Sequence, residues 1–359
     1  MNPWPGGSLV PRALVIAAVL AVAVPLAVVR LGELPPPVTV SVEGQFRYLR
    51  QGTTFGQVIH AFGLKASSGK LFDVEGAVID PHADPGHVLL NGQSASHKTA
   101  LAEGDAVVVD NGRDRTEGTR VVRTPLPGRQ PGDPQFFLGT SKVIEETTEG
   151  RISGKVVALT YRSVGKAKRP PAVALTFDDG PWSGSTRKIL HILHHFHVLA
   201  TFFVIGQQAE AHPQLVHREI EQGMTVGNHS WDHPNTIAFS KLAPHRLMEE
   251  MSRTDDQLRK LGVKDPRYMR PPGGSYDGRM IAIARSFGLR LVNWDVDPRD
   301  WESGATRESI VRNVLANVRP GSIVDLHDGG GNQSATVRAL PLIIKGIRRM
   351  HLKLVALPA

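Results

Sequence analysis

The stretch VALTFDDG, residues 173–180, joins an apolar run to two adjacent acids and a glycine. A short apolar run bounded by a turn signal is typical of a buried strand. Neighbouring side chains on a strand point to opposite faces, and adjacent carboxylates repel each other. Gly180 would let the backbone turn out of the strand. We therefore expect Asp178 and Asp179 to face different partners that offset their charges.

Short apolar runs and helical segments alternate on the carboxyl-terminal side of this stretch. The predicted strands are Val173–Phe177, Ala200–Ile205, Thr225–Gly227, Tyr268–Arg270, Leu289–Trp294, Ser322–Leu326 and Leu352–Val355. The predicted helices are Ser185–His195, Pro213–Gln222, Pro244–Leu261, Gly278–Phe287, Thr306–Val318 and Ala335–Met350. Alternating strands and helices indicate a parallel sheet. The pattern predicts an α/β fold, a small (β/α) barrel with its functional residues at the carboxyl ends of the strands.

Polar clusters follow several of these strands. They are Asp178-Asp179, His229 with His233, Arg270, the run from Asp297 to Trp301, and His327-Asp328. Each cluster taken alone is an ordinary loop, but a barrel brings the loops after its strands to one face. We therefore expect these side chains to converge.

Metal ligation is predicted from His and carboxylate residues, because the chain has no cysteine. His229 and His233 are four positions apart, so one helical turn would place both imidazoles on one face. Two His and one carboxylate bind zinc and leave a position for water. His191 and His195 have the same spacing but lie inside a predicted helix, and we interpret them as part of an exposed helix face.

The ordered motifs TFDDG (176–180), HSWDH (229–233), RPPGG (270–274), DPRDW (297–301) and LHD (326–328) carry a resemblance to a known family. Residues 171–356 closely resemble the NodB-homology polysaccharide deacetylases, which are metal-dependent carbohydrate esterases. The resemblance implies a distorted (β/α) barrel that removes acetyl groups from N-acetylated sugars, or in some members O-acetyl groups. It covers about half of the chain.

The resemblance also implies roles for individual residues. Asp179, His229 and His233 would bind the metal. Asp178 would act as the general base and His327 would protonate the leaving amine.

Four further residues would support that chemistry, again by resemblance. Arg270 would orient the base, and Asp297 would raise the pKa of His327. The backbone N–H of Gly273 would stabilise the oxyanion, and Trp301 would help to wall the site.

Two positions depart from the family pattern. Gly273 stands where the third motif often has an aromatic residue, so a side-chain wall is lost. Asp325 stands where an aliphatic residue lines the pocket for the acetyl methyl group. A carboxylate there is unfavourable unless it is solvated, paired or protonated.

The amino-terminal segment is typical of a protein that is exported from the cytoplasm. Residues 13–29 are uncharged and lie between Arg12 and Arg30, a length at the short limit for a membrane span. We predict a signal anchor with a stiff spacer over 1–36, and a cleaved signal peptide is the alternative. Either places the remaining chain outside the cytoplasm, in the cell envelope or secreted.

Two segments lie between the anchor and the catalytic domain. Residues 37–123 read as strand, short helix and further strands, and they resemble small β-grasp modules. Residues 124–170 are predicted to form a linker and a β-hairpin, and residues 171–359 the deacetylase domain.

The net charge of +8 is spread along the chain, which argues against nucleic acid as a partner and suits an anionic cell wall. We expect acetylated cell-wall glycan as substrate, peptidoglycan first, with the membrane contacted through residues 13–29 and no obligate protein partner. The expected metal is Zn²⁺, although Co²⁺, Mn²⁺, Fe²⁺ or Ni²⁺ suit the same ligands. The alternatives are a hydrolase of another carbohydrate ester or non-peptide amide, and a non-catalytic wall-binding protein.

Overall fold

The computed structural model describes residues 36–126 and 135–358. The predicted anchor at 13–29 lies outside these residues. Within the described ranges, no helix combines the length and the apolar character that a membrane crossing needs. The chain divides into two compact units: one runs to Ala66 and includes His87–Asp110, and the other comprises Ser67–Gly86 and the chain from Asn111 onward.

The first unit is a mixed four-stranded sheet with one helix. Its elements are β1 (Val38–Val42), β2 (Gln45–Leu49), α1 (Phe55–Ala61), β5 (His87–Leu90) and β6 (Ala106–Asp110). The strand order is β2-β1-β6-β5, and β1 runs parallel to β6. A capping box between Thr54 and Gln57 starts α1, whose Phe55 and Val58 share a core with Val40. The β-grasp likeness of this arrangement remains a prediction.

The structure divides the segment that the sequence suggested was one module over 37–123. The strands β3 (Gly69–Phe72), β4 (Val78–Asp84) and β7 (Arg115–Thr116) form a separate sheet in the second unit. This sheet belongs to the second unit because its residues contact the turn of the hairpin that follows it in the chain. Glu117 accepts hydrogen bonds from the backbone N–H groups of Ile152 (2.6 Å) and Ser153 (3.0 Å), and Lys155 pairs with Asp73 at 2.8 Å.

The predicted hairpin is present as part of a larger antiparallel sheet. It consists of β9 (Thr140–Gly150) and β10 (Val156–Lys168), and β8 (Thr119–Leu126) pairs with β9. The sheet packs on helix α6 (Gly278–Ser286), where Leu159 shares a core with Met280 and Ala284. Because β10 runs to Lys168, strand structure extends almost to the end of the segment over 124–170 that we expected to be a linker and a hairpin.

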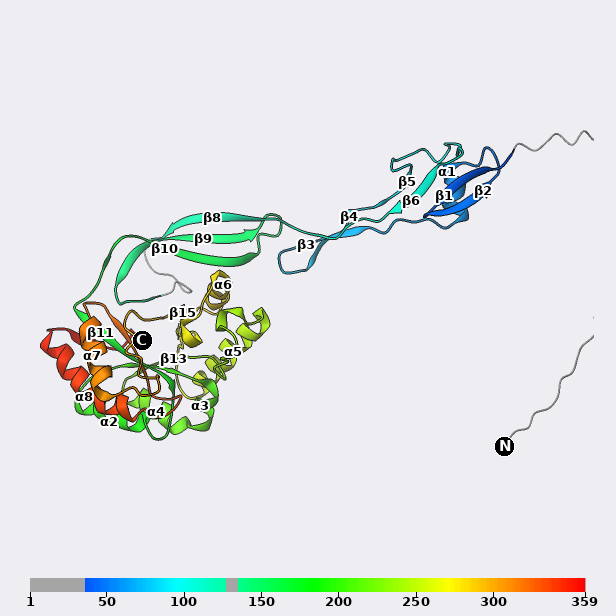
Figure 1. Ribbon diagram of the computed structural model, residues 1–359. Coiled ribbons are helices and arrows are strands. Elements are labelled where there is room, and N and C mark those ends of the chain that lie inside the picture. Colours follow the sequence, from blue (N-terminus) through cyan, green and yellow to red (C-terminus); the bar gives the residue numbers. More distant parts are fainter. Residues whose placement is uncertain (1–35, 127–134, 359) are drawn as a thin grey trace, which may run out of the picture. The chain divides into compact units, whose positions relative to one another are not determined.

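The largest sheet in the described ranges has seven parallel strands and curls into a half-barrel, which agrees with the predicted distorted barrel (Figure 1). Its strands are β11 (Ala172–Gly180), β12 (Thr201–Val204), β13 (Thr225–Asn228), β14 (Tyr268–Met269), β15 (Arg290–Leu291), β16 (Ile323–His327) and β17 (Lys353–Val355). The order is β15-β14-β13-β12-β11-β16, with β17 also paired to β11. Each predicted strand is present, and β14 and β15 are shorter than expected.

The helices between the strands also follow the sequence pattern. They are α2 (Thr186–His195), α4 (Pro213–Glu221), α5 (Pro244–Lys260), α6, α7 (Arg307–Asn317) and α8 (Ser334–Arg349). The short helix α3 (Gly206–Ala211) was not predicted. It buries only Gly206 and Ala209, so its sequence carries no apolar period.

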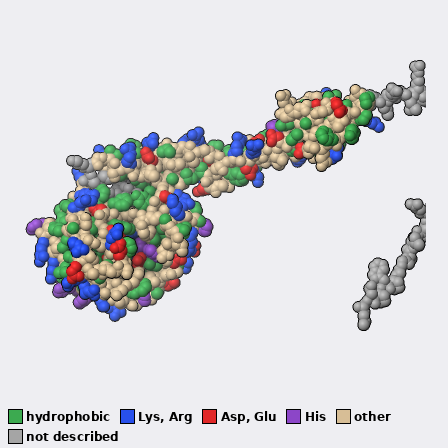
Figure 2. All heavy atoms as spheres, in the orientation of Figure 1, with side chains coloured by type: hydrophobic (Ala, Val, Ile, Leu, Met, Phe, Trp, Pro, Cys, Tyr) green, Lys and Arg blue, Asp and Glu red, His purple; other side chains and the backbone are tan. Residues whose placement is uncertain are grey.

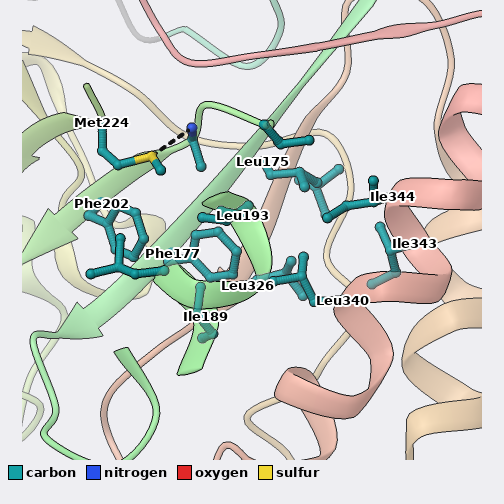
Figure 3. Packing of buried hydrophobic residues seen from close by; sticks show 14 of the residues in the cluster. Leu175, Phe177, Ile189, Leu193, Phe202, Met224, Leu326, Leu340, Ile343 and Ile344 are labelled. Atoms are coloured by element: carbon teal, nitrogen blue, oxygen red, sulfur yellow. Dashed lines mark hydrogen bonds between the residues drawn. The ribbon is translucent and has the colours of Figure 1, made fainter. Parts of the chain in front are cut away.

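The main core fixes the central strand that carries the two acids. In Figure 3, Leu175 and Phe177 of β11 lie among side chains from β12 and α8. The rings of Phe177 and Phe202 stack with centroids 5.1 Å apart. Burying a side chain of this size contributes about 1.5–3 kcal/mol, so β11 is a firm support for Asp178 and Asp179.

The surface charges are dispersed. On the face in Figure 2, Lys and Arg side chains are scattered among acidic and neutral ones instead of forming one basic patch. This distribution agrees with a net charge that is spread along the chain.

Candidate active site

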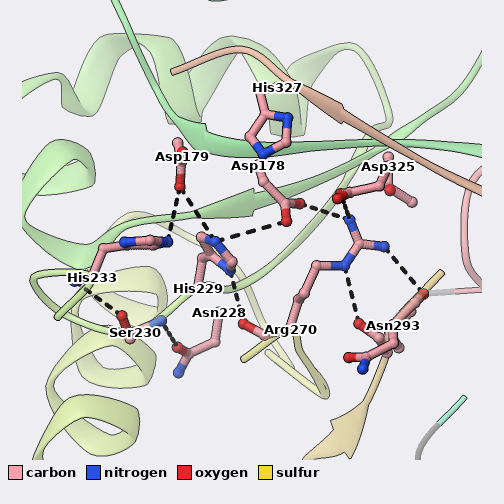
Figure 4. A network of polar contacts seen from close by, with 12 residues as sticks. Asp178, Asp179, Asn228, His229, Ser230, His233, Arg270, Asn293, Asp325 and His327 are labelled. Carbon is pink, nitrogen blue, oxygen red and sulfur yellow. Dashed lines mark hydrogen bonds and ion pairs between the residues drawn. The ribbon is translucent and has the colours of Figure 1, made fainter. Parts of the chain in front are cut away.

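The predicted site residues meet at the carboxyl edge of the sheet (Figure 4). Asp178 and Asp179 end β11, and His229 follows β13 directly. Arg270 follows β14, and His327 ends β16. Asp178 and His327 are register partners on neighbouring parallel strands, so their side chains lie on the same face. The convergence predicted for these loops is confirmed for this set.

The two adjacent acids are separated by the backbone conformation of Asp179. Its φ of 69° lies in the left-handed region, which an L-residue rarely adopts and which is found at functional sites. The chain therefore turns already at Asp179, one residue before Gly180, where we had expected the turn. Glycine is needed at 180 for a different reason: a Cβ there would lie 2.2–2.5 Å from the carboxylate of Asp328.

Asp179, His229 and His233 form a candidate metal centre, which we call the metal half of the site. Asp179 Oδ1 lies 3.3 Å from His229 Nε2 and 3.4 Å from His233 Nε2. Three donors at zinc–ligand bond lengths of about 2.0–2.1 Å in a tetrahedron lie about 3.3–3.4 Å apart. Within the described chain, Asp179 Oδ1 is buried without a hydrogen-bond partner, a cost that a cation would remove. The residues present therefore fit a divalent metal.

The tautomer of His229 suits this role. Its Nδ1 lies 2.8 Å from the carbonyl oxygen of Arg270, so Nδ1–H donates and the Nε2 lone pair faces Asp179. Burial opposes ionisation of Asp179. The closeness of His229 and the charge of His233 nevertheless hold the pKa of Asp179 well below its usual range.

The two histidines come together through a loop, not through the helical turn suggested by their spacing. Ser230 and His233 have φ values of 67° and 51°, which fold the segment tightly. Buried Glu250 of α5 accepts hydrogen bonds from the N–H groups of Trp231 (2.7 Å) and Asp232 (3.2 Å). Glu250 could not be identified from the sequence, because it lies 19 positions after Trp231, inside a helix.

Arg270 and Asp325 belong to the other side of the site. Arg270 is fully buried, and its Nη1 donates to Asp178 Oδ1 at 2.8 Å and to Asp325 Oδ1 at 2.7 Å. The unusual carboxylate at 325 is thus paired, one of the conditions under which we considered it tolerable. Burial and the charge of Asp178 raise the pKa of Asp325 well above its ordinary value, while Arg270 and His327 oppose that shift.

The partner of His327 is Asp300, so the prediction of Asp297 was wrong. His327 Nδ1 lies 2.8 Å from Asp300 Oδ1, and the His327 N–H donates to Asp300 Oδ2 at 3.0 Å. Asp297 is exposed, and its carboxylate accepts from the N–H of Arg299 at 2.8 Å. Arg299 adopts a φ of 58°, which turns the chain so that Asp300 faces inward. Two acids three positions apart in one motif could not be told apart from sequence alone.

Asp300 changes the proton affinity of His327. Burial lowers the pKa of an imidazole, but the hydrogen bond and charge of Asp300 outweigh that effect, and Asp325 and Asp178 add to it. The pKa of His327 is raised to about 10. His327 is therefore charged near neutral pH and able to donate a proton. Asp178, Arg270, Asp325, His327 and Asp300 together form what we call the proton-transfer half of the site.

The predicted roles of Gly273, as the donor to the oxyanion, and of Trp301, as a wall of the site, remain predictions. Gly273 has φ 60° and ψ 20°, and a Cβ there would meet nothing within 4 Å. An aromatic side chain at this position would thus extend into open space. Trp301 is 55% exposed, so it is not part of the barrel core.

Asp328 is a structural residue beneath the site. It is fully buried, and its carboxylate accepts a hydrogen bond from the hydroxyl of Thr186. Its backbone carbonyl accepts from Ser185 Oγ at 2.5 Å, so it ties the start of α2 to the end of β16. Burial raises the pKa of Asp328 to about 7.

The chain is similar in sequence to known proteins. A family model for polysaccharide deacetylases matches residues 165–292. A peptidoglycan-N-acetylglucosamine deacetylase of Bacillus cereus is 36% identical over 188 residues, which are 52% of this chain and 67% of that protein. A chitooligosaccharide deacetylase of Bradyrhizobium sp. is 35% identical over 209 residues, 55% of this chain and 94% of that protein.

Solved structures agree with the sequence relatives. A peptidoglycan N-acetylglucosamine deacetylase superposes with a TM-score of 0.50 at 35% identity, covering 53% of this chain and 87% of that one. A family 4 carbohydrate esterase pseudoenzyme of Bacillus anthracis gives the same TM-score at 20% identity. The match covers 62% of this chain and 87% of the pseudoenzyme chain. The second likeness shows the fold alone.

Proposed function

Because the chain belongs to the polysaccharide deacetylase family, we propose that it is a metal-dependent hydrolase that removes acetyl groups from N-acetylated cell-wall glycan, with peptidoglycan as its substrate. The observation that carries this proposal is the geometry of the two adjacent acids. Asp179 faces two imidazoles with no protein donor for its Oδ1 in the described ranges, while Asp178 is held by Arg270. One acid is thus free to bind a cation and the other is oriented for proton transfer.

The metal half would hold the cation through Asp179 Oδ1, His229 Nε2 and His233 Nε2. We propose zinc, because two imidazoles and one carboxylate are its common ligand set, and Co²⁺, Mn²⁺, Fe²⁺ or Ni²⁺ suit the same donors. When bound, the cation supplies Lewis acidity to the amide carbonyl and to water.

Asp178 is placed to accept the proton of the attacking water. Its Oδ1 is bound to Arg270, whereas its Oδ2 lies 3.7 Å from His229 Nε2, on the side of the metal half. The proton accepted by Asp178 comes from water as the C–O bond to the acetyl carbon forms. Arg270 fixes the carboxylate so that Oδ2 keeps this orientation.

His327 is placed to protonate the leaving nitrogen. An amine anion is a very poor leaving group, so the C–N bond breaks only as a proton reaches nitrogen. Asp300 keeps the imidazole protonated and fixes its orientation through Nδ1, which leaves Nε2–H for the substrate. The products are acetate and a free amino sugar.

We propose that the protein works in the cell envelope, on the outer side of the membrane. The support is the uncharged segment at 13–29, together with relatives whose names include peptidoglycan as substrate. Chitooligosaccharides are the second substrate class to test, because relatives of similar identity carry that name.

A non-catalytic wall-binding role is the competing function, since a pseudoenzyme has the same fold. The presence of Asp178, Asp179, His229, His233 and His327 in one site favours catalysis.

Acetate release from purified peptidoglycan tests the proposal. The protein is stripped with a chelator, and activity is measured before and after each divalent metal is added back. We expect loss and recovery of acetate release. A metal-loaded protein that releases no acetate from peptidoglycan, chitooligosaccharides or acetylated xylan would contradict the proposed function, and equal wall binding by the Asp178→Asn variant would then support the binding role.

A further inference from the structure

Asp325 is a buried acid inside the site to which the proposed mechanism gives no task. It lies two residues before His327 on β16, so both side chains project from the same face of the sheet. Its register partner is Thr176, two residues before Asp178 on β11. Single ligand atoms of Asp178, Asp325 and His327 all lie within 4.8 Å of one another. Asp325 therefore lies directly beneath His327 and Asp178 on the same face of the sheet.

Arg270 does not need Asp325 in order to be held. Its Nε donates to the carbonyl of Val292 at 3.0 Å and its Nη2 to that of Asn293 at 3.4 Å. The guanidinium also lies 4.4 Å from the ring centroid of Phe203, so aromatic packing adds to its fixation. One carboxylate, that of Asp178, would suffice to complete the ion pair.

The one nitrogen that faces the site is shared between two acids. Nη1 carries two hydrogens, and Asp178 Oδ1 takes one at 2.8 Å while Asp325 Oδ1 takes the other at 2.7 Å. Both carboxylates are nearly fully buried, with exposures of 2% and 3%. Burial and the charge of Asp178 raise the pKa of Asp325 well above its ordinary value, so Asp325 is the acid of the pair that gives up its charge more readily, while its Oδ1 still accepts from Nη1.

We propose that Asp325 is a positioning residue for the deacetylation reaction: it takes the second hydrogen of Arg270 Nη1, so that Asp178 is held through one oxygen only. The inference rests on the proposed function. Without Asp325, Nη1 is free to shift toward Asp178 and to engage its Oδ2 as well. That oxygen would then be lost as the proton acceptor.

Two substitutions test the hydrogen bond from Arg270 Nη1. Asp325→Asn keeps an oxygen that accepts from Nη1. Asp325→Leu removes the acceptor and keeps a similar volume. We expect the Leu variant to lose about tenfold or more in kcat with KM changed by less than about threefold, since Asp178 is misplaced. We expect the Asn variant to recover most of that loss, because its side-chain oxygen still accepts from Nη1.

The assays use the full chain, loaded with metal, and acetate release from N-acetylated glycan across pH. Metal content and melting temperature are measured for each variant, and Asp256→Asn, an exposed acid on α5, is the matched control. Wild-type kcat in the Leu variant, or no rescue by the Asn variant, overturns the proposal. If the Leu variant does not fold, Asp325→Ala, which also removes the acceptor, is measured in its place, and wild-type kcat in that variant overturns the proposal.

A second readout keeps this test separate from the proposed function. A crystal structure of Asp325→Leu is determined without substrate. A guanidinium of Arg270 that engages both oxygens of Asp178 supports the positioning role even if no glycan is hydrolysed by the wild type. An unchanged contact between Arg270 and Asp178 contradicts it, whatever the activity.

Discussion

The two halves of the active site differ in how well the protein satisfies its own polar groups. In the metal half, Asp179 Oδ1 is buried with two imidazole nitrogens at 3.3 and 3.4 Å and accepts no hydrogen bond from a described residue. In the proton-transfer half, Asp178, Asp325 and His327 all have hydrogen-bonded partners at 2.7–2.8 Å. The metal half therefore needs a partner for Asp179 Oδ1 that the described residues do not supply. In the proton-transfer half, the polar groups satisfy one another.

This difference explains the two adjacent acids that end β11. A pair of carboxylates can be kept ionised either by a cation from solution or by an internal cation. The chain uses both, one for each acid: an external metal for Asp179 and the Arg270 guanidinium for Asp178. The left-handed backbone at Asp179 is what allows neighbours in sequence to face separate partners.

The largest expected effect comes from removing the base while leaving the metal half intact. Asp178→Asn should lower kcat about 10²–10⁴-fold, the usual contribution of a positioned general base. It should leave the metal affinity within about threefold of wild type, because Arg270 and not the metal holds this carboxylate. Acetate release and metal content are measured on the same preparation. Loss of metal by this variant would show that the halves are not separate.

The complementary change weakens the metal first. Asp179→Asn removes a proposed ligand, so metal affinity should fall by more than about 100-fold, beyond what loss of an outer-shell partner costs. Activity should return in part at high metal concentration. The affinity is measured by competition with a chelating dye, and His229→Ala serves as the second ligand variant. If Asp178→Asn and Asp179→Asn bind metal equally well, the assignment of the two acids is wrong.

The metal half was largely predictable from sequence because its residues lie in short motifs directly after strands. His229 and His233 have the same spacing as His191 and His195, yet only the first pair follows a strand. Position relative to a strand end was therefore more informative than the spacing. The helical turn expected for the first pair was wrong, because Glu250, from another part of the chain, folds that segment as a loop.

The proton-transfer half was predicted less well because its pairings depend on tertiary contacts. Arg270, Asp325 and Asp300 come from three different strand ends or loops, and their mutual distances are set by the register of the sheet. The choice between Asp297 and Asp300 depended on one left-handed residue, Arg299. The division of the 37–123 segment was not predicted for a similar reason: it depends on Glu117, which binds a hairpin turn more than thirty positions away.

A smaller effect tests the corrected partner of His327. Asp300→Asn should lower the pKa of His327 from about 10, move the basic limb of the activity profile to lower pH and reduce kcat about tenfold near neutral pH. A raised folded-state pKa stabilises the fold fully below the unfolded value of about 6.5, and this stabilisation is lost as pH rises through about 10. The variant should therefore lose less stability than wild type between those limits. Asp297→Asn should change neither property, because among the described residues the carboxylate of Asp297 accepts a hydrogen bond from its own loop, from the N–H of Arg299. A larger shift in that variant would restore the original assignment.

The smallest expected effect concerns the histidine pair that shares the spacing but not the site. His191 and His195 are exposed on α2, so replacing both by Ala should alter the free energy of unfolding by about 0.5 kcal/mol or less. The metal content should remain unchanged in this double variant, whereas the matched double variant His229→Ala/His233→Ala should lose the metal. Both are compared by metal analysis after dialysis against a weak chelator. A fall in bound metal on removing His191 and His195 would mean that the spacing alone is enough to bind a cation, and that a position after a strand is not required.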